Sequence, residues 1–178
     1  EGVEVVDGAG CSLLDNAIFG NGTEAGDAGV VVEGGCEVVM KGNRVYDLNQ
    51  VGVILKERAT GLLEENDLFR NRTANLQISS RAAPVVRKNL IHDCHGVGVL
   101  VDNQGEGEIR DNQIYANQGD GVRVSAGGRP NMTANTVYDN KGFGVRVEDS
   151  SNGKFDANEV FKCNLGAISV SSRSDPTV

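Results

Sequence analysis

Asparagine recurs at a fixed interval through most of the chain, and this interval constrains the fold more than any other feature. Six asparagines follow one another every 23 residues, and a seventh precedes them by 27 residues; the seven are Asn16, Asn43, Asn66, Asn89, Asn112, Asn135 and Asn158. The first segment therefore holds four extra residues, which we place in a loop at residues 22–28. A fixed period of this length indicates a repeat architecture.

Every repeat has the same apolar positions when the repeats are aligned on their asparagine. The second residue after the asparagine is apolar and the third has a ring in its side chain, as Ile91 and His92 do after Asn89. The ninth place is mostly glycine and the tenth and twelfth are apolar, as in Val99 and Val101; the twentieth is apolar again, as in Ile109. Three short alternating runs between turn-forming residues predict three short β-strands per repeat and no helix.

A unit of three short strands cannot bury its apolar positions alone, but coiling pairs each strand with the equivalent strand one repeat later. The sequence therefore predicts an all-β fold, a right-handed parallel β-helix of seven to eight coils of 23 residues. We expect one domain over residues 1–178. Because Glu1 falls inside a repeat and the chain stops before the next asparagine, we also expect this domain to be cut at both ends from a longer chain.

The seven asparagines are predicted to form a structural ladder and not a binding site. Asparagine tolerates the backbone of a tight bend, and its amide both donates and accepts hydrogen bonds. Stacked amides would bond along the axis and satisfy the buried groups of the bend. Five places further on, a second ladder with interruptions is expected at Asn21, Asn71, Asn117 and Asn140.

The composition of the chain argues against several classes of binding partner. The net charge of −8 argues against nucleic acid and against an anionic membrane, both of which need clustered Lys and Arg. It disfavours an acidic polysaccharide for the same reason, although a local basic patch would override it. The four cysteines form no disulfide framework, with a Cys11–Cys36 bridge as the alternative to free thiols in a reducing compartment. No Cys/His cluster suggests a metal, and we expect no cofactor.

Candidate site residues come from the strand that follows the glycine column, at its outward places. Arg123 and Arg146 fall in neighbouring repeats and are flanked by Asp102 and Glu148, which suits either anion binding or a solvated surface of ion pairs. Apolar residues also face outward on this strand, as in a protein interface. The candidate partner-binding residues are Ile54, Leu100, Asp102, Arg123, Arg146 and Glu148.

Part of the chain is similar in amino-acid sequence to a known family. The stretch GLLEENDLFRN (residues 61–71), the stretch PVVRKN (residues 84–89) and the repeated N-x-I-[FYH] and G-V-x-V elements resemble the CASH-type β-helix repeats of the F-box-only ubiquitin-ligase adaptors. In that family the β-helix holds a substrate and an F-box elsewhere recruits the ligase. The resemblance implies a non-catalytic recognition module that is intracellular, in the cytoplasm or the nucleus.

Two functions from different classes remain open. The outward aliphatic residues favour a protein-recognition scaffold, consistent with the resemblance. The alternative is a carbohydrate-active β-helix, a lyase, epimerase or hydrolase that acts on acidic sugars. Such chemistry needs a cluster of carboxylates or an arginine base on one outer face. We identify no catalytic residue, because the sequence contains neither a paired-aspartate motif nor an Asp-Pro-x-Glu motif.

Overall fold

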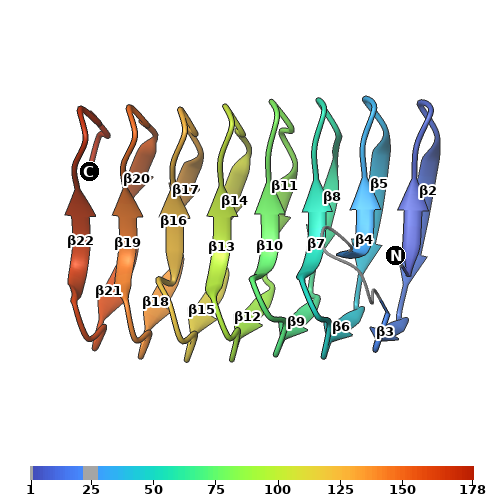
Figure 1. The fold of residues 1–178 in the computed structure, drawn as a ribbon, viewed down its shortest axis with the longest axis horizontal. Helices are drawn as coiled ribbons and strands as arrows, with labels where there is room; N and C mark the ends of the chain where they lie inside the picture. Colours follow the sequence, from blue (N-terminus) through green and yellow to red (C-terminus); the bar gives the residue numbers. More distant parts are fainter. Residues whose placement is uncertain (1, 22–27) are drawn as a thin grey trace.

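The computed structural model describes residues 2–21 and 28–178 and consists of short β-strands joined by turns. They form three parallel sheets that run along the rod (Figure 1). Sheet A consists of β1 (Val3–Val5), β4 (Ala28–Val32), β7 (Val51–Leu55), β10 (Ala74–Ile78), β13 (Val97–Val101), β16 (Val122–Val124), β19 (Phe143–Val147) and β22 (Gly166–Val170). Sheet B consists of β2 (Gly10–Leu14), β5 (Glu37–Lys41), β8 (Thr60–Glu64), β11 (Val85–Arg87), β14 (Glu108–Arg110), β17 (Asn131–Thr133) and β20 (Lys154–Asp156). Sheet C consists of β3 (Ala17–Phe19), β6 (Arg44–Tyr46), β9 (Asp67–Phe69), β12 (Leu90–His92), β15 (Gln113–Tyr115), β18 (Thr136–Tyr138) and β21 (Glu159–Phe161).

Each strand pairs in parallel with the equivalent strand of the next coil. From β4 onward the partners are 23 residues apart, as Ala28 and Val51 are. Between the first two coils they are 27 apart, as Ala17 and Arg44 are, so the four extra residues lie between β3 and β4. The loop predicted at residues 22–28 lies outside the described residues, apart from Ala28 at the start of β4. The predicted all-β parallel β-helix with 23-residue coils is confirmed.

The core is built from the predicted apolar columns. In the central coils Ile91, Val99 and Val101 are fully buried. At the C-terminal end of the rod the same columns are open, and Ile168 and Val170 are 40% and 46% exposed. Burial therefore depends on stacking one coil on the next, which is how a solenoid stabilises repeats that could not fold alone.

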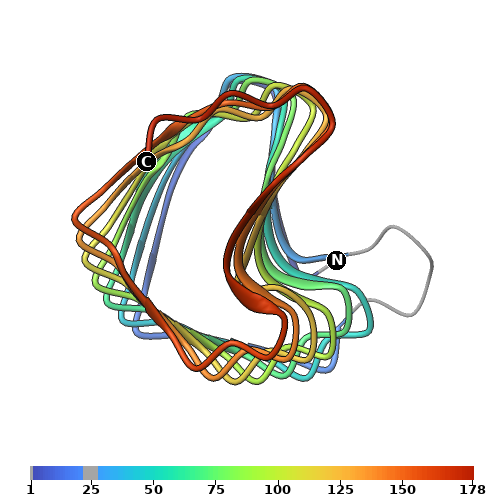
Figure 2. The same cartoon turned by 90° about the vertical axis from the view of Figure 1, so that its left-hand side faces the viewer.

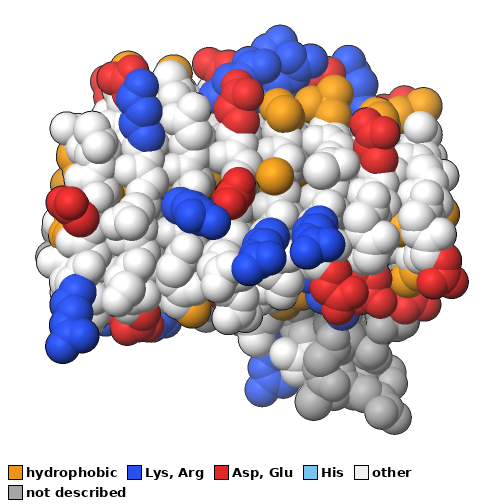
Figure 3. Space-filling model, turned by 90° about the horizontal axis from the view of Figure 1, so that it is seen from above, with side chains coloured by type: hydrophobic (Ala, Val, Ile, Leu, Met, Phe, Trp, Pro, Cys, Tyr) orange, Lys and Arg blue, Asp and Glu red, His pale blue; other side chains and the backbone are white. Residues whose placement is uncertain are grey.

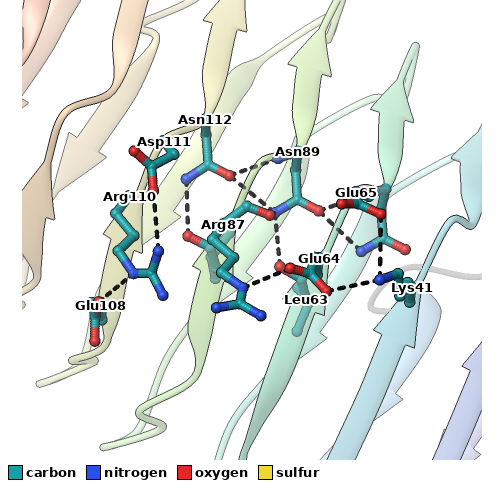
Figure 4. A network of polar contacts seen from close by, with 12 residues as sticks. Lys41, Leu63, Glu64, Glu65, Arg87, Asn89, Glu108, Arg110, Asp111 and Asn112 are labelled. Carbon is teal, nitrogen blue, oxygen red and sulfur yellow. Dashed lines mark hydrogen bonds and ion pairs between the residues drawn. The ribbon is translucent and has the colours of Figure 1, made fainter.

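The first asparagine ladder runs along the bend between sheets B and C. The backbone N–H and the Nδ2 of Asn66 both donate to Oδ1 of Asn89, at 2.9 and 3.0 Å, and Nδ2 of Asn89 donates to the carbonyl of Leu63 (Figure 4). The same pattern links all seven asparagines; the bonds are Asn16 to Asn43, Asn43 to Asn66, Asn66 to Asn89, Asn89 to Asn112, Asn112 to Asn135 and Asn135 to Asn158.

The backbone of this bend has one further regular feature. The left-handed conformation is taken by the residue before each ladder asparagine, for example Glu65 with φ 56° and Lys88 with φ 54°. The ladder asparagines themselves are not among the residues with positive φ. Asparagine is required at its place for the amide, because its side chain satisfies buried backbone groups of two coils at once.

A second ladder lies five places further on, between sheets C and A, and it is interrupted. Asn117 donates through Nδ2 to Oδ1 of Asn140 at 2.9 Å. One coil before Asn117, the place is taken by Cys94, and here Asn75 supplies the missing amide. Nδ2 of Asn71 donates to Oδ1 of Asn75 at 2.9 Å, and Nδ2 of Asn75 donates to Oδ1 of Asn117 at 3.4 Å. Asn75 therefore bridges the gap in the ladder.

The predicted ring column forms a continuous stack on the outer side of sheet C. Successive rings lie 4.7 to 5.3 Å apart between centroids and are nearly parallel; they are Phe19, Tyr46, Phe69, His92, Tyr115, Tyr138 and Phe161. His92 is held on both sides, by Asp93 at Nδ1 (2.7 Å) and by Asp67 at Nε2 (2.9 Å). Because the ring faces contact one another, only ring edges point to solvent along the middle of the stack.

Charged residues at the end of the sheet B strands form a second set of links between coils (Figure 4). The buried Glu64 contacts Lys41 of the previous coil at 3.1 Å and Arg87 of the next at 2.8 Å. The hydrogen bond from Lys41 and the charge of Arg87 hold the pKa of Glu64 below its usual value. Arg110 does not continue this line, because it turns to Glu108 of its own strand at 2.5 Å.

The cross-section of the rod is not a regular triangle. Figure 2 shows, down the axis, that the coil bends inward along sheet A between two outward corners. One corner is the turn from sheet A to sheet B; the other comes directly before each strand of sheet A, at residues such as 72–73 and 95–96. The inward bend gives sheet A a concave outer face.

Candidate functional site

The concave face of sheet A is the candidate functional site, because its outward side chains are less exposed than those of the other sheets. Leu100 and Arg123 are half-buried and Asp120 is buried, although all three point away from the core. By contrast, outward residues of sheets B and C such as Glu108 and Leu90 are exposed. A ligand laid along this face would run between the two corners, with the outward side chains of sheet A as its floor.

Two arginines and one glutamate form the most ordered polar cluster on this face. Arg123 and Arg146 lie opposite each other in β16 and β19. Nε of Arg123 donates to Oε1 of the buried Glu148 at 2.6 Å, and Nη2 of Arg146 lies 2.8 Å from Oε2 of the same carboxylate. Each guanidinium has five N–H donors, so both keep donors for a ligand. The cluster carries a net charge of +1 and is held in place by one carboxylate.

Asp102 lies on the same face but does not join this cluster. Its Oδ2 accepts a hydrogen bond from Nε2 of Gln77 at 3.0 Å. Its Oδ1 is buried and has no hydrogen-bond partner among the described residues. A buried acceptor without a partner is costly, and this oxygen is covered by the protein itself. Of the two acids predicted to flank the arginines, Glu148 contacts both, whereas Asp102 bonds Gln77.

The N-terminal part of the concave face carries several aliphatic side chains, together with Gln77 and the Lys56–Glu33 ion pair. Ile54 and Leu100 point outward from β7 and β13 and are half-buried, with Val51 and Val97 beside them. Val31, at the equivalent place of β4, is buried. The six predicted site residues therefore lie on one face but in two parts, an aliphatic part with Ile54 and Leu100 and a charged part with the two arginines, Asp102 and Glu148.

The corner that precedes sheet A carries exposed polar side chains, and we call it the acid-free ridge. It is formed by the sixth residue after each ladder asparagine: Asn49, Arg72, His95, Gln118, Lys141 and Asn164, all exposed. A hollow of about 410 Å³ lies at Arg72 and His95, with Asp47 and Arg70 in its lining. Hydrogen bonds from Arg70 hold the pKa of Asp47 below its usual value. The cations of the ridge itself have no acid in their column.

Sequence reasoning missed this ridge. The signal is present, because the sixth place contains two strong cations, one histidine and three amides in a chain of net charge −8. What the sequence does not show is that this column borders the charged part of sheet A. That position depends on the inward bend of the coil (Figure 2).

Other features of the described residues bear on what the chain holds. All four cysteines are free, including Cys11 and Cys36. Within residues 2–21 and 28–178 no group of three or more His, Cys, Asp or Glu side chains is placed to hold a metal ion. In the same ranges no helix is long and apolar enough to cross a membrane.

The chain belongs to the right-handed beta helix region family, whose model matches residues 1–127 and again residues 28–178. This agrees with the predicted right-handed coil. No curated protein matches the chain in sequence. The F-box adaptor family that residues 61–71 and 84–89 resemble is supported neither by the family match nor by the solved structures described next.

Two solved structures have the same fold at low sequence identity. A mutant of the periplasmic alginate epimerase AlgG is 17% identical, with a TM-score of 0.73 over 94% of this chain and 50% of its own. The A-module of the Azotobacter vinelandii mannuronan C-5 epimerase AlgE6 is 15% identical, with a TM-score of 0.52 over 85% of this chain and 57% of its own. The chain thus spans about half the length of each, and the likeness shows the fold.

Proposed function

We propose that the concave face of sheet A binds an extended acidic polysaccharide. The observation that carries this proposal is the Arg123–Glu148–Arg146 cluster. A single buried carboxylate holds two guanidinium groups in place, and both keep free donors toward the ligand side. Guanidinium is suited to carboxylate because its planar donors match the two oxygens of a uronic acid group.

The distribution of charge supports the same ligand. The net charge of −8 describes the whole chain, and on that basis we expected an acidic polymer to be disfavoured. The acid-free ridge adds positive charge beside the concave face, since Arg72 and Lys141 stand in one exposed column. A local field of one sign attracts a polyanion even when the total charge is negative.

The concave face also offers an acceptor for a sugar hydroxyl. Gln77 donates through Nε2 to Asp102, which leaves the amide oxygen of Gln77 as an acceptor on this face. An acidic polysaccharide supplies both carboxylates for the arginines and hydroxyl donors for the amide oxygen of Gln77. The alginate epimerases of similar fold act, by their names, on alginate and mannuronan, which are acidic polysaccharides.

The test is calorimetric titration with oligomers of mannuronate and of galacturonate, and with a neutral glucan oligomer as a charge control. We expect binding of an acidic oligomer, and weakening by about tenfold in Arg123→Gln and in Arg146→Gln, from the loss of charged hydrogen bonds. Arg129→Gln is the matched control, because Arg129 is exposed and bonded to Glu106 away from the concave face. Equal affinity for the neutral glucan, or no effect of either floor variant, would refute the proposal.

The same oligomers separate binding from catalysis. The NMR spectrum of the sugar after prolonged incubation reports inversion at C5 or chain cleavage directly. A changed spectrum that depends on Asp102 would make the chain a carbohydrate-active enzyme. An unchanged spectrum with intact binding would make it a polysaccharide-binding module.

A protein ligand is the second candidate, and the aliphatic part of the concave face is the observation that favours it. Half-buried Ile54 and Leu100 could anchor an apolar side chain of a partner, the role that the F-box resemblance implies. The test is Leu100→Glu, with Lys154→Glu as an exposed control. Loss of a specific partner only in the Leu100 variant, with polyuronate binding retained, would support this candidate; partner capture unaffected by Leu100→Glu would exclude this part of the face.

A further inference from the structure

The corner between sheets A and B is a stack of tight turns, and its middle part is hollowed. Each turn is closed by a bond from its fourth N–H to its first carbonyl, for example Ala59 to Lys56 (3.1 Å) and Ala82 to Ser79 (3.0 Å). The two central residues of each turn have positive φ, as in type I′ turns. A hollow of about 530 Å³ is lined by residues 34–35, 57–58, 80–81 and 103–104.

Arg58 and Arg81 stand side by side in this hollow. They occupy the same place in consecutive coils, about 4.8 Å apart along the rod, and both are exposed. Nε of Arg81 donates to Oε1 of Gln104 at 2.9 Å, and neither guanidinium is ion-paired with any residue that the structure describes. Figure 3 looks down on this corner and shows adjacent basic side chains there.

Other arginines in the rod, unlike Arg58 and Arg81, are paired with a carboxylate. Arg70 is paired with Asp47, Arg110 with Glu108 and Arg129 with Glu106. Like charges opposite each other on neighbouring strands repel, and the repulsion is relieved when an anion lies between them. Two adjacent arginines without a carboxylate partner therefore form a site for an external anion.

The charge and shape of the hollow point to one kind of anion. Glu57 also lines the hollow, so the two arginines and this glutamate sum to a net charge of +1, which matches a monoanion. Two guanidinium groups from consecutive coils of one column present two sets of donors to the same hollow. A tetrahedral group with several acceptor oxygens can accept from both, whereas a carboxylate matches one guanidinium in bidentate fashion. A sulfate ester is both tetrahedral and monoanionic.

We propose that Arg58 and Arg81 form a binding site for a sulfate ester group. We assign the sulfate ester to the polysaccharide on the adjacent concave face, and this choice of carrier rests on the proposed function. The site itself does not, because it can be tested with a probe too small to reach the concave face.

The probe is methyl sulfate, followed by the NMR signals of the arginine Nε–H groups. We expect the signals of Arg58 and Arg81 to shift on titration, and Arg58→Gly or Arg81→Gly to weaken binding by about tenfold. Glycine suits φ 63°, the angle of both residues, so these variants should unfold at the same or a higher temperature than the parent.

Arg173→Gly is the matched control, since Arg173 is exposed in the same column at φ 61° but has Ser150 in place of an arginine in the preceding coil. An equal shift of the Arg173 signal, or binding that survives both glycine variants, would overturn the site. Tighter binding of methyl phosphate than of methyl sulfate would overturn the choice of a monoanion.

The carrier is tested separately with a sulfated and a desulfated form of one polyuronate. We expect the sulfated form to bind more tightly, with the advantage lost in Arg58→Gly. Methyl sulfate binding without any polyuronate binding would keep the site and refute the proposed function. Equal binding of the two polyuronates would keep the proposed function and refute this carrier.

Discussion

The two asparagine ladders run the length of the same rod but differ in continuity. The first has an asparagine in every coil from Asn16 to Asn158, and each amide bonds the next. In the second ladder, Asn71, Asn117 and Asn140 share their column with residues that have no side-chain amide, among them Cys94. The second survives because Asn75, from a different column, bridges the gap.

The difference shows that the ladder place and the glycine column are one packing unit. A Cβ on Gly52 would lie 2.6 Å from Nδ2 of Asn71, and one on Gly98 would lie 2.7 Å from Nδ2 of Asn117. Glycine therefore makes room for the asparagine of the next coil. Where the next coil has the smaller Cys94, the glycine place holds Asn75 instead, so this pair also keeps one amide.

The largest effect is expected from breaking the continuous ladder. Asn89→Leu removes the acceptor of two donors of Asn66 and the donor to the carbonyl of Leu63, all of them buried. At about 1–3 kcal/mol for each unsatisfied buried group, we expect the free energy of unfolding to fall by about 3–5 kcal/mol. Urea unfolding followed by circular dichroism measures this loss.

Asn131→Leu is the control for the continuous ladder, because Asn131 is exposed on β17. Its effect should stay within about 0.5 kcal/mol. Comparable losses in the two variants would mean that the ladder amides contribute no more than a surface asparagine.

The interrupted ladder should be weakened by a smaller amount and should be repairable. Asn75→Gly removes the acceptor of Nδ2 of Asn71 and a donor to Asn117, at a cost of about 2–3 kcal/mol. Cys94→Asn alone should also destabilise, since two amides then compete for one space. The double variant recreates the Gly98–Asn117 type of pair, and we expect it to be more stable than either single variant.

The coupling energy between the substitutions at residues 75 and 94 tests this prediction. Residues that share one space and one hydrogen-bond network show coupling energies of about 0.5–3 kcal/mol. Additive losses in the double variant would mean that residues 75 and 94 do not form a unit.

The comparison also shows what the sequence reveals. The columns, the strands, the coil length and both ladder positions follow from periodicity, because a solenoid places each period in the same environment. The bridge at Asn75 was not predicted, since an asparagine in a glycine column looks like an exception until the partner across the coil is known. The left-handed residue before each ladder place was also missed, because it is as varied as Glu65, Lys88 and Ala134.

One further regularity of the sequence lies at the start of the sheet B strands. In the column that opens the sheet B strands, glycine and proline alternate from coil to coil, as Gly61, Pro84, Gly107, Pro130, Gly153 and Pro176. In the structure a Cβ on Gly107 would lie 2.8 Å from the carbonyl oxygen of Pro84, so each proline coil is followed by a coil without a side chain there.

The candidate site is less predictable than the fold. Arg123 and Arg146 fall in adjacent repeats and their pairing follows from the period. The concave shape of sheet A and the position of the acid-free ridge depend on how far each corner projects, which periodicity does not determine.

Alkaline pH should separate the two ladders, because only the interrupted one contains a thiol. Burial raises the pKa of Cys94 from 9.0 to about 11. The folded state therefore holds this proton more tightly than the unfolded state, so its contribution is complete below pH 9.0 and is lost as the pH rises to about 11. The loss amounts to about 2–3 kcal/mol at the upper limit.

The measurement compares urea unfolding of the parent chain and of the Asn75→Gly/Cys94→Asn double variant across this pH range. Lysines and tyrosines titrate in both proteins, so the difference between the two curves isolates Cys94. We expect the parent to lose more stability than the double variant. Parallel curves would show that the thiol titrates alike in the folded and unfolded states.

The smallest effect tests what the two ladders share. Ala134 precedes a ladder asparagine of the continuous ladder with φ 54°, and Ala116 precedes Asn117 of the interrupted one with φ 55°. Glycine takes this conformation without the steric cost of a Cβ, which outweighs its greater entropy in the unfolded chain. We expect Ala134→Gly and Ala116→Gly each to stabilise by about 0.5–1 kcal/mol, whereas Ala82→Gly, at a buried residue without positive φ, should destabilise. Thermal unfolding measures the stability of each variant. Equal gains in stability at both bends would mean that the two ladders differ in their amides alone. A gain at Ala134 with a loss at Ala116 would mean that they also differ in their backbone.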